Sequence, residues 1–322
     1  MVKALVTGGL GFVGSSVTSE FHRRGYEVHV LDNLFVGTRE RAREFPDGIT
    51  IHAVDIRDAV AMSKVLSRVR PQIVVHLAAL HYIPYCNVNP LECYDVNVRG
   101  TSVLLDALER CGVERVFLAS TAGVYQPSEA PNQEDNPGWP VDIYGFSKRA
   151  GEFAIGEWAA RSGVPVVIGR YYNVFGYGET SPHIIPVLVS QVRDGVCQIK
   201  VGNLSSRRDY VHVTDIARIT CDLVGLHTDG VLVANIGTGV SYSVQDIIDM
   251  LSDHLQRPLE VQQDPRRMRK QDRPNLVADV SRLRNLGLVL PQVGLRDGLR
   301  ELVDRGVGPY MSPRFADFLG DR

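Results

Sequence analysis

One tyrosine and one lysine in this sequence are spaced so that they could share a proton. Tyr144 and Lys148 stand at positions i and i+4 of a segment that predicts a helix, so their side chains share one face of it. An ammonium group beside a phenol stabilises the phenolate and lowers the pKa of the tyrosine toward neutrality. The pair therefore predicts a general base for a substrate hydroxyl. Such a pair alone is more often a solvated helix face, so its meaning depends on its surroundings.

A glycine-rich turn near the start of the chain has the spacing of a dinucleotide-binding site. Gly8, Gly11 and Gly14 follow a short apolar, β-branched run and open an amphipathic stretch, which predicts strand, turn and helix. The first glycine permits the tight turn, the second lets backbone approach a pyrophosphate, and the third allows close packing of helix on strand. The helix N-terminus at Phe12 and Val13 offers N–H groups and the positive end of its dipole to the phosphates.

An acidic residue then indicates which dinucleotide is bound. Asp32 ends the second predicted strand, about 20 residues after the glycines. A carboxylate there suits a ribose 2′-hydroxyl and repels a 2′-phosphate, so NAD is favoured over NADP. The glycines alone could be a structural turn in another α/β protein. The agreement of strand, helix, second strand and acid favours dinucleotide binding.

The elements that must position these residues alternate along the chain. Strands are predicted at 2–7, 27–31, 49–54, 71–79, 115–119 and 164–169, and the helices include 90–111 and 144–162. This alternation predicts an α/β fold with a doubly wound parallel sheet, in which ligands bind beyond the carboxyl ends of the strands. Ser120 and Thr121, and the segments 78–86 and 170–173, come directly after strands and are therefore candidates for the site.

The second half of the chain has a looser pattern. It predicts a helix at 182–195, strands at 207–213 and 231–236, the latter a candidate to rejoin the main sheet, and a loop at 263–275. We expect an NAD-binding domain of residues 1–173 plus about 207–238. A smaller, discontinuous α/β lobe for the substrate would comprise about 174–206 and 239–322.

Composition excludes several classes of partner. The 322 residues carry a net charge of −2, with 44% hydrophobic and 22% charged residues, so neither nucleic acid nor an anionic membrane surface is an expected partner. The five cysteines lack C-x-x-C spacing and indicate neither a disulfide framework nor a zinc site, and no metal is expected. No apolar run reaches membrane-spanning length, and a reducing cytoplasm fits.

The motifs taken together resemble those of a known family. They are the glycine turn, Asp32-Asn33-Leu34, Asp55, His76-Leu77-Ala78-Ala79, Ser120-Thr121, Tyr144-x-x-x-Lys148, Arg170-Tyr171-Tyr172-Asn173 and Arg207 to Val213. On them the chain resembles the extended short-chain dehydrogenase/reductases, specifically the NAD-dependent sugar-nucleotide epimerase/dehydratase family, over nearly its whole length. The resemblance implies a Rossmann domain with NAD and a nucleotide-diphosphate sugar as substrate.

The resemblance also implies roles for single residues. On the cofactor side it implies Asn33 beside Asp32, Asp55 and Ile56 at the adenine, Leu77, Ala78, Ala79 and Tyr171 toward the nicotinamide, and Lys148 on the nicotinamide ribose. On the substrate side it implies Thr121 at the sugar O4, Tyr85 in the sugar pocket, and Asn173, Arg208 and Arg269 on the diphosphate. Ser120 would join Thr121, Tyr144 and Lys148 as a catalytic residue.

The implied chemistry begins with oxidation at C4 of the sugar. Tyr144 takes the proton of the 4-hydroxyl while the C4 hydride passes to NAD, which gives a 4-keto sugar. An epimerase turns the ketone over and returns the hydride to its other face, whereas a dehydratase uses the ketone to acidify C5–H. The family's usual 4,6-dehydratases carry Asp-Glu after the threonine, but this chain has Ala122-Gly123 there. Ordinary 4,6-dehydration is therefore not expected.

The segment from His81 to Asn87 is expected to be a loop, and it is a second departure from the common 4-epimerases, for which the resemblance implies a small or serine-rich loop there. It should line the sugar pocket, and Cys86 is its sharpest candidate for exchanging a proton with C5 or the C6 hydroxyl, although most cysteines are inert packing residues. The chain also resembles the UDP-N-acetylglucosamine 5,6-dehydratases of tunicamycin biosynthesis. The favoured prediction is accordingly 5,6-dehydration of a UDP-hexosamine, narrowly ahead of 4-epimerisation.

Two further expectations concern another class of function and the assembly. A non-catalytic NAD-binding scaffold or redox sensor is the alternative from another class, but Tyr144, Lys148 and Thr121 together argue against it because binding alone would not require all three. By analogy with the family, the helices at 90–111 and 144–162 would pair across a homodimer interface.

Overall fold

The structure, a computed structural model, describes residues 1–193, 195, 197–268 and 273–318. The chain divides into two units. The first comprises Met1–Gln126, Pro137–Tyr171 and Ile216–Ala234, and the second comprises Pro127–Asn136, Tyr172–Asp215 and Asn235–Arg322. The predicted boundary returns the chain to the first domain at about residue 207. In the structure the return comes at Ile216, because the strand that begins at Arg207 pairs within the second unit.

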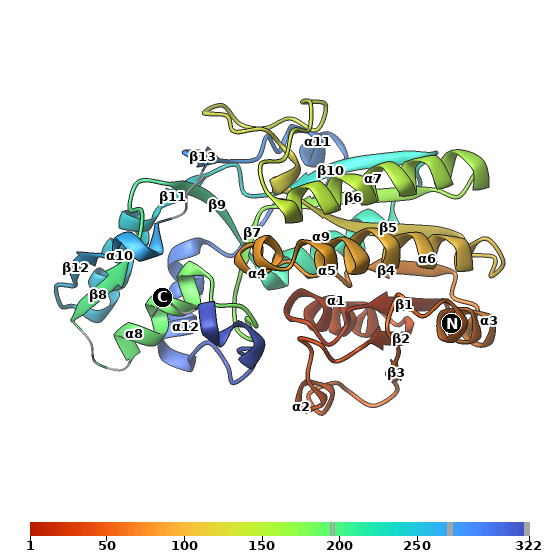
Figure 1. Ribbon diagram of the computed structural model, residues 1–322, viewed down its shortest axis with the longest axis horizontal. Helices are drawn as coiled ribbons and strands as arrows, with labels where there is room; N and C mark the ends of the chain where they lie inside the picture. The colour runs from red at the N-terminus through yellow and green to blue at the C-terminus, as the bar shows by residue number, and fades with distance from the viewer. Residues whose placement is uncertain (194, 196, 269–272, 319–322) are drawn as a thin grey trace. The chain divides into compact units, whose positions relative to one another are not determined.

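A seven-stranded sheet forms the centre of the first unit (Figure 1). Its strands are β1 (Lys3–Thr7), β2 (Glu27–Asp32), β3 (Thr50–Ala53), β4 (Ile73–His76), β5 (Arg115–Thr121), β6 (Val166–Tyr171) and β10 (Val231–Ile236), in the order β10-β6-β5-β4-β1-β2-β3. Each neighbouring pair of strands from β6 across the sheet to β3 is parallel. The order reverses at β1, which pairs with β2 on one side and β4 on the other, so the predicted doubly wound fold is confirmed. The predicted return of 231–236 to this sheet is confirmed as well.

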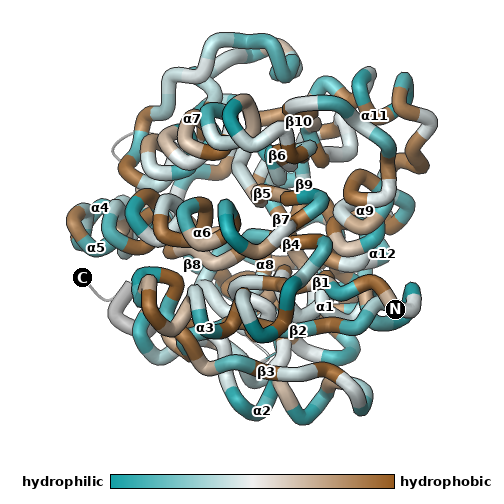
Figure 2. Tube along the Cα trace, turned by 90° about the vertical axis from the view of Figure 1, so that its right-hand side faces the viewer, coloured by the Kyte–Doolittle hydropathy of each residue, from teal (hydrophilic) through white to brown (hydrophobic). Residues whose placement is uncertain are grey.

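Helices pack on the sheet because its central strands are apolar on both faces. Every residue of β4 and β6 is buried, and Figure 2 colours hydrophobic residues along the chain brown. The helices of this part of the chain are α1 (Phe12–Arg23), α2 (Arg39–Ala42), α3 (Ala59–Val69), α4 (Ile83–Val88), α5 (Pro90–Tyr94), α6 (Gly100–Leu108), α7 (Ile143–Ser162) and α9 (Val213–Gly225). Helix α6 contacts α3 and α7, and the buried Trp158 of α7 belongs to the core beneath them. Figure 1 shows α6 and α7 side by side.

Two predicted segments differ in the structure. The helix expected at 90–111 is interrupted, since a π-helical turn (Asp95–Arg99) separates α5 from α6. The segment expected to be a loop after Ala79 contains the short helix α4, with Pro84 in its first turn where a missing N–H costs nothing.

The second unit has its own smaller sheets and core. Its strands are β7 (Asn173–Phe175), β9 (Arg207–His212), β11 (Ser241–Ser243) and β13 (Asn275–Leu276) in one sheet, and β8 (Gln198–Val201) with β12 (Glu260–Gln263) in another. Its helices are α8 (Ile184–Arg193), α10 (Val244–Leu255), α11 (Ser281–Asn285) and α12 (Leu295–Arg305). Helix α10 begins with a capping box between Ser243 and Asp246, and α8, α10 and α12 share one apolar core.

Membrane-spanning helices are absent from the described residues. None of the helices in that part of the chain combines the length and the apolar character needed to cross a bilayer.

Candidate active site

The glycine turn between β1 and α1 leaves no space for side chains. Gly8 has a φ of +70°, and a Cβ there would lie 2.8 Å from the Ala78 Cα. A Cβ at Gly14 would lie 2.0 Å from the Gly8 carbonyl oxygen, and one at Gly11 would lie 3.2 Å from the same oxygen. Helix α1 then begins at Phe12 without a side-chain cap. A turn of bare backbone leading into an uncapped helix N-terminus fits the pyrophosphate of a dinucleotide.

Asp32, at the end of β2, is tied to this turn. Its carboxylate accepts hydrogen bonds from the Leu10 N–H at 3.0 Å and from the Leu34 N–H at 2.8 Å. Burial raises the pKa of Asp32, while these two N–H groups and the charge of Arg41 act in the opposite direction. The acid therefore lies beside the glycine turn, where the role predicted for it on the ribose remains a proposal.

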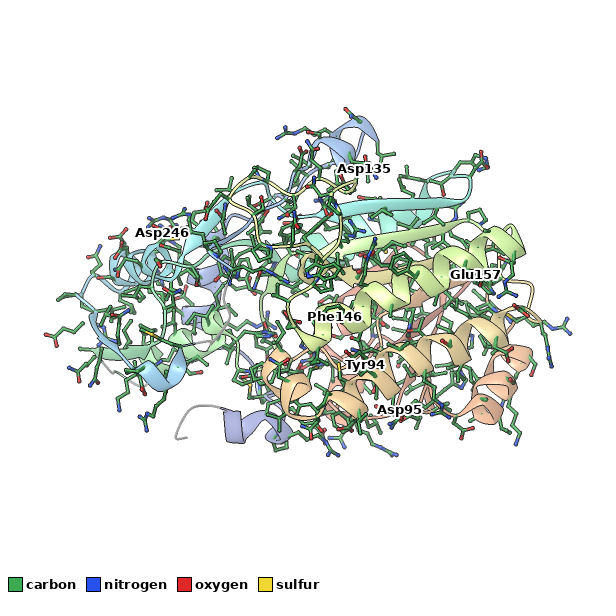
Figure 3. All side chains as sticks on the ribbon, turned by 45° about the horizontal axis from the view of Figure 1, so that its top comes forward. Tyr94, Asp95, Asp135, Phe146, Glu157 and Asp246 are labelled. Atoms are coloured by element: carbon green, nitrogen blue, oxygen red, sulfur yellow. The ribbon has the colours of Figure 1, made fainter. Side chains whose placement is uncertain are left out.

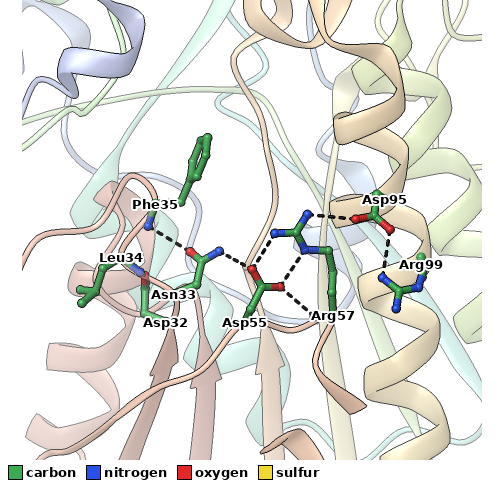
Figure 4. Close-up of polar contacts among 8 residues, drawn as sticks. All are labelled: Asp32, Asn33, Leu34, Phe35, Asp55, Arg57, Asp95 and Arg99. Carbon is green, nitrogen blue, oxygen red and sulfur yellow. Dashed lines mark hydrogen bonds and ion pairs between the residues drawn. The ribbon is translucent and has the colours of Figure 1, made fainter. Parts of the chain in front are cut away.

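Asp55, predicted to lie at the adenine, belongs to a chain of polar contacts (Figure 4). It accepts hydrogen bonds from Asn33 at 2.8 Å and from both the main chain and the side chain of Arg57 at 2.9 Å. Arg57 also bonds to Asp95, which accepts a further bond from Arg99. The hydrogen bonds from Arg57 hold the pKa of Asp55 well below its usual range. The segment around Asp55 is thereby joined to the π-helical turn.

The other residues predicted on the cofactor side also lie in the first unit. Ile56 is buried in its core, and Leu77 and Ala78 donate main-chain hydrogen bonds to the carbonyl and the hydroxyl of Thr7, so the segment through Ala79 follows the glycine turn closely. Tyr171 ends β6, and its hydroxyl is hydrogen-bonded to Thr220 at 2.7 Å. Burial raises the pKa of Tyr171.

Tyr144 and Thr121 are brought together by α7 and β5. Thr121 is the last residue of β5, Tyr144 lies in the first turn of α7, and their side chains are hydrogen-bonded. The sequence predicts a lowered pKa for Tyr144, and the structure shows the opposite direction. Burial of the phenol raises its pKa, and the hydrogen bond to Thr121 offsets this only in part. Tyr144 is thus protonated until an added positive charge stabilises its phenolate.

Lys148 lies one turn further along α7 and is almost fully buried. Burial lowers the pKa of Lys148 to about 8, although the charges of Glu152 and Cys93 act to raise it. The ammonium form therefore predominates at pH 7 but is lost in mildly alkaline solution. This residue can supply the positive charge that Tyr144 needs.

Glu152, which was not among the residues selected from the sequence, is the centre of a buried polar network. It accepts hydrogen bonds from Ser120 at 2.5 Å, from Arg149 at 2.5 Å and from Arg170 at 2.9 and 2.8 Å. Arg170 in turn donates to the Tyr125 hydroxyl at 2.8 Å. Although burial acts to raise it, the pKa of Glu152 is lowered by these partners, Arg170 first. Its position at i+4 from Lys148 was the signal in the sequence that could have identified it.

The network and the fold change the roles of two predicted catalytic residues. Ser120 donates its hydroxyl hydrogen to Glu152 and so orients this network. Cys86 is fully buried on α4, where its thiol contacts the Leu80 carbonyl oxygen at 3.6 Å. Its hydrogen bond with Cys93, together with burial, raises the pKa of Cys86 far above its ordinary value. A buried, protonated thiol has the properties of a packing residue, which argues against the acid or base predicted at Cys86.

A second missed residue, Asn97, fixes the segment after β4. From the π-helical turn it accepts the Leu80 N–H at 2.7 Å and donates to the Leu80 carbonyl at 2.8 Å and to Ser147 of α7 at 2.8 Å. Tyr85, predicted in the sugar pocket, donates its hydroxyl hydrogen to Glu92 at 2.6 Å. The strand end, α4 and the turn that carries Tyr144 are therefore held together by buried polar contacts.

The residues predicted to hold the diphosphate belong to the second unit. Asn173 begins β7, opposite Tyr210 of β9. Arg208 donates to the carbonyl oxygens of Arg207 and Arg273, each at 2.8 Å. Arg269 lies outside the described residues. Binding of a diphosphate by Asn173, Arg208 and Arg269 is therefore still a prediction.

Comparison with known proteins agrees with this geometry. Residues 4–237 match the model of the NAD dependent epimerase/dehydratase family. The GDP-6-deoxy-D-talose 4-dehydrogenase of Aggregatibacter actinomycetemcomitans is 32% identical over 88% of this chain and 91% of the relative. The UDP-glucose 4-epimerase of Streptomyces lividans is 34% identical over 83% of this chain and 85% of the relative.

A solved structure extends the likeness to three dimensions. The UDP-glucose 4-epimerase of Thermus thermophilus, in complex with NAD, superposes with a TM-score of 0.86 and 30% identity over 95% of this chain and 99% of that chain. The glycine turn, Asp32 and Lys148, which are predicted to hold NAD, are all present in this chain. The protein is an NAD-dependent enzyme of the epimerase/dehydratase family.

Proposed function

We propose that this protein is a 4-epimerase of a nucleotide-diphosphate hexose, with a UDP sugar as its substrate. The observation that carries the proposal is the hydrogen-bonded pair of Thr121 and Tyr144 with the buried Lys148 one turn away. The relatives named above act at C4 of a sugar by their names, which supports the same position here. We assign NAD and the reacting hexose to the first unit, which carries Thr121, Tyr144 and Lys148.

Tyr144, Thr121 and Lys148 divide the proton chemistry between them. When bound, NAD supplies the hydride acceptor and donor for C4 of the sugar, and its oxidised ring carries a positive charge. Burial raises the pKa of Tyr144, and in the proposed mechanism the Lys148 ammonium stabilises its phenolate. The phenolate then takes the proton of the 4-hydroxyl and returns it after the sugar has turned over, while Thr121 orients the sugar O4.

The surroundings of this trio support epimerisation over dehydration. Ala122 and Gly123 are buried in a short 3-10 turn after β5 and bring no acid or base. The start of α7 packs on this turn, since a Cβ at Gly145 would lie 2.5 Å from the Gly123 carbonyl oxygen. Cys86, on which the predicted 5,6-dehydration depended most, is buried and protonated. Neither position offers a base for the C5 proton.

We also propose that the active form is a homodimer. Helices α4, α5 and α7 expose large apolar side chains, namely Val88 at 69%, Leu91 at 83%, Phe146 at 44% and Phe153 at 65%. Figure 3 labels Tyr94 of α5 and Phe146 of α7, and these two helices contact each other. A monomer rarely exposes so many large apolar groups on adjacent helices. Sedimentation at micromolar concentration should give twice the chain mass, and Leu91→Glu should give the monomer.

An assay with separate sugar nucleotides tests the proposed reaction. UDP-glucose, UDP-galactose and UDP-N-acetylglucosamine are each incubated with the purified protein, and the products are followed by NMR. The C4 epimer of at least one substrate should appear, and the reverse reaction should reach the same equilibrium mixture. A product that has lost water would support the 5,6-dehydratase instead, and no turnover of any sugar nucleotide would favour a non-catalytic role.

A further inference from the structure

Helix α2 carries a buried arginine that the proposed mechanism does not use. Arg41 is 3% exposed, whereas Arg39 on the same helix and Arg43 directly after it are exposed. Removing a guanidinium from water is unfavourable unless its N–H groups are hydrogen-bonded. The contacts of Arg41 should therefore show what the buried charge does.

Arg41 is hydrogen-bonded to the glycine turn. One guanidinium nitrogen donates to the Gly11 carbonyl oxygen at 2.8 Å and to the Ser15 hydroxyl at 3.1 Å. Its main-chain N–H is capped by Thr38 at 3.3 Å, which fixes the start of α2. The cation is thus held next to the backbone that the pyrophosphate of NAD approaches.

The segment that carries Arg41 lies directly on the same turn. A Cβ at Gly37 would be 2.8 Å from the Leu10 Cβ, so only glycine allows this approach. Asp32 accepts the Leu10 N–H at 3.0 Å. The dipeptide of Leu10 and Gly11 is consequently held at both ends. The Asp32 carboxylate, at the end of β2, accepts its N–H, and the Arg41 guanidinium, in the chain that follows β2, donates to its carbonyl oxygen.

We propose that Arg41 is a positioning residue of the NAD site, which holds the glycine turn in its phosphate-binding conformation and adds a fixed positive charge at the ADP half of the cofactor. The Arg41 guanidinium also works against the burial that raises the pKa of Asp32, so it favours the ionised acid that the ribose needs. The inference concerns cofactor binding and does not depend on which sugar is the substrate.

Binding of NAD and of ADP-ribose to the variants tests the proposal. ADP-ribose has the pyrophosphate and adenosine but lacks the nicotinamide, so a defect at Arg41 should weaken both ligands equally. Arg41→Leu should weaken each by about 10- to 100-fold in calorimetry, and purified protein should retain less NAD. Arg41→Lys keeps the charge with a different geometry and should be intermediate. Arg39→Leu, an exposed change on the same helix, should bind as the unaltered protein does.

Two results would overturn the proposal. The first is that Arg41→Leu binds NAD and ADP-ribose as tightly as Arg39→Leu does. The second is that Arg41→Leu loses affinity for NAD but not for ADP-ribose, which would place the defect at the nicotinamide end. Circular dichroism and ligand-free melting show whether each variant is folded. If Arg41→Leu does not fold, Arg41→Lys decides the question, because unchanged affinity for ADP-ribose would remove the role of the guanidinium.

Discussion

Ser120 donates a 2.5 Å hydrogen bond to Glu152, and both side chains are buried. The bond joins the end of the strand that carries Thr121 to the helix that carries Tyr144 and Lys148. Because Glu152 also accepts two hydrogen bonds from Arg170 of the next strand, one carboxylate fixes three elements at the site. The charge of Glu152 acts to raise the pKa of Lys148, so the network acts on the proposed catalytic cation as well as on the fold.

Glu152→Gln should change both stability and the pH dependence of the reaction. The amide keeps the shape but leaves the buried charges of Arg170 and Lys148 without their counter-ion, which should destabilise the fold by about 3–5 kcal/mol. The pKa of Lys148, about 8 in the unaltered protein, should fall. The alkaline limb of the profile of kcat against pH should move to lower pH. Cys93 of α5 and His76 of β4 also face Lys148 and are unchanged in this variant.

Glu157→Gln is the matched control, because Glu157 lies on the same helix, is exposed and pairs at the surface with Arg161. The alkaline limb of the profile of kcat against pH should stay at the same pH in Glu157→Gln as in the unaltered protein. If both variants keep the unaltered profile, Glu152 has only a structural role.

Tyr144→Phe should retain NAD and lose nearly all turnover. The ring still packs at the start of α7, but the group that takes the sugar proton is gone, and loss of a general base typically reduces the rate by ~10²–10⁴-fold. The variant's NAD content and melting temperature should match those of the unaltered protein. A near-normal rate would mean that another group takes the 4-hydroxyl proton.

The doubly wound parallel sheet and the cofactor turn could be predicted because they follow from local patterns. Buried parallel strands appear in the sequence as continuous apolar runs. The glycines at 8, 11 and 14 are required because other backbone atoms lie too close for a side chain, and their spacing is visible in the sequence. The association of Thr121, Tyr144 and Lys148 was predicted from strand ends and helical spacing, and the structure brings Thr121 and Tyr144 into contact.

What could not be predicted depends on contacts between distant segments. Cys86 was selected for its reactivity, and only the packing of α4 shows that it is buried. The presence of Lys148 predicted a lowered pKa for Tyr144, but burial of the phenol raises it. The π-helical turn with Asn97 has no signal in helical periodicity, and the partners of Glu152 come from three elements. Tertiary burial thus decides which of the candidates can do chemistry.

His76 should make the fold sensitive to acid. It is buried at the end of β4, with Thr7 and Thr101 hydroxyls at 2.7 and 3.0 Å from its ring nitrogens. Burial, followed by the charge of Lys148, lowers the pKa of His76 to about 3. Between pH 6.5 and about 3 the unfolded chain therefore binds one more proton at this residue, and stability falls as the pH falls, by about 1.4 kcal/mol per pH unit.

Urea unfolding at several pH values measures this slope. His76→Asn removes the titrating group while keeping a polar side chain between the two threonines, so its stability should fall less steeply below pH 6.5. An identical slope in the variant would assign the acid sensitivity to other groups.

Cys86→Ala should leave catalysis almost unchanged. The thiol is fully buried, so its loss should reduce stability by about 1 kcal/mol through a small cavity and change the rate less than about twofold. Activity is compared with that of Tyr144→Phe in the same assay. A loss of rate comparable to that of Tyr144→Phe would restore Cys86 to the catalytic residues.

The proposed reaction removes and returns hydrogen at C4 of the sugar and leaves C5 untouched. Turnover of UDP-glucose and of UDP-N-acetylglucosamine in deuterated buffer, followed by mass spectrometry and NMR, measures this directly. Since Ala122, Gly123 and the buried Cys86 offer no base for C5, the product should be the C4 epimer, of unchanged mass and without deuterium at C5. A product lighter by one water with new alkene signals, or deuterium at C5, would contradict the account and establish proton removal at C5.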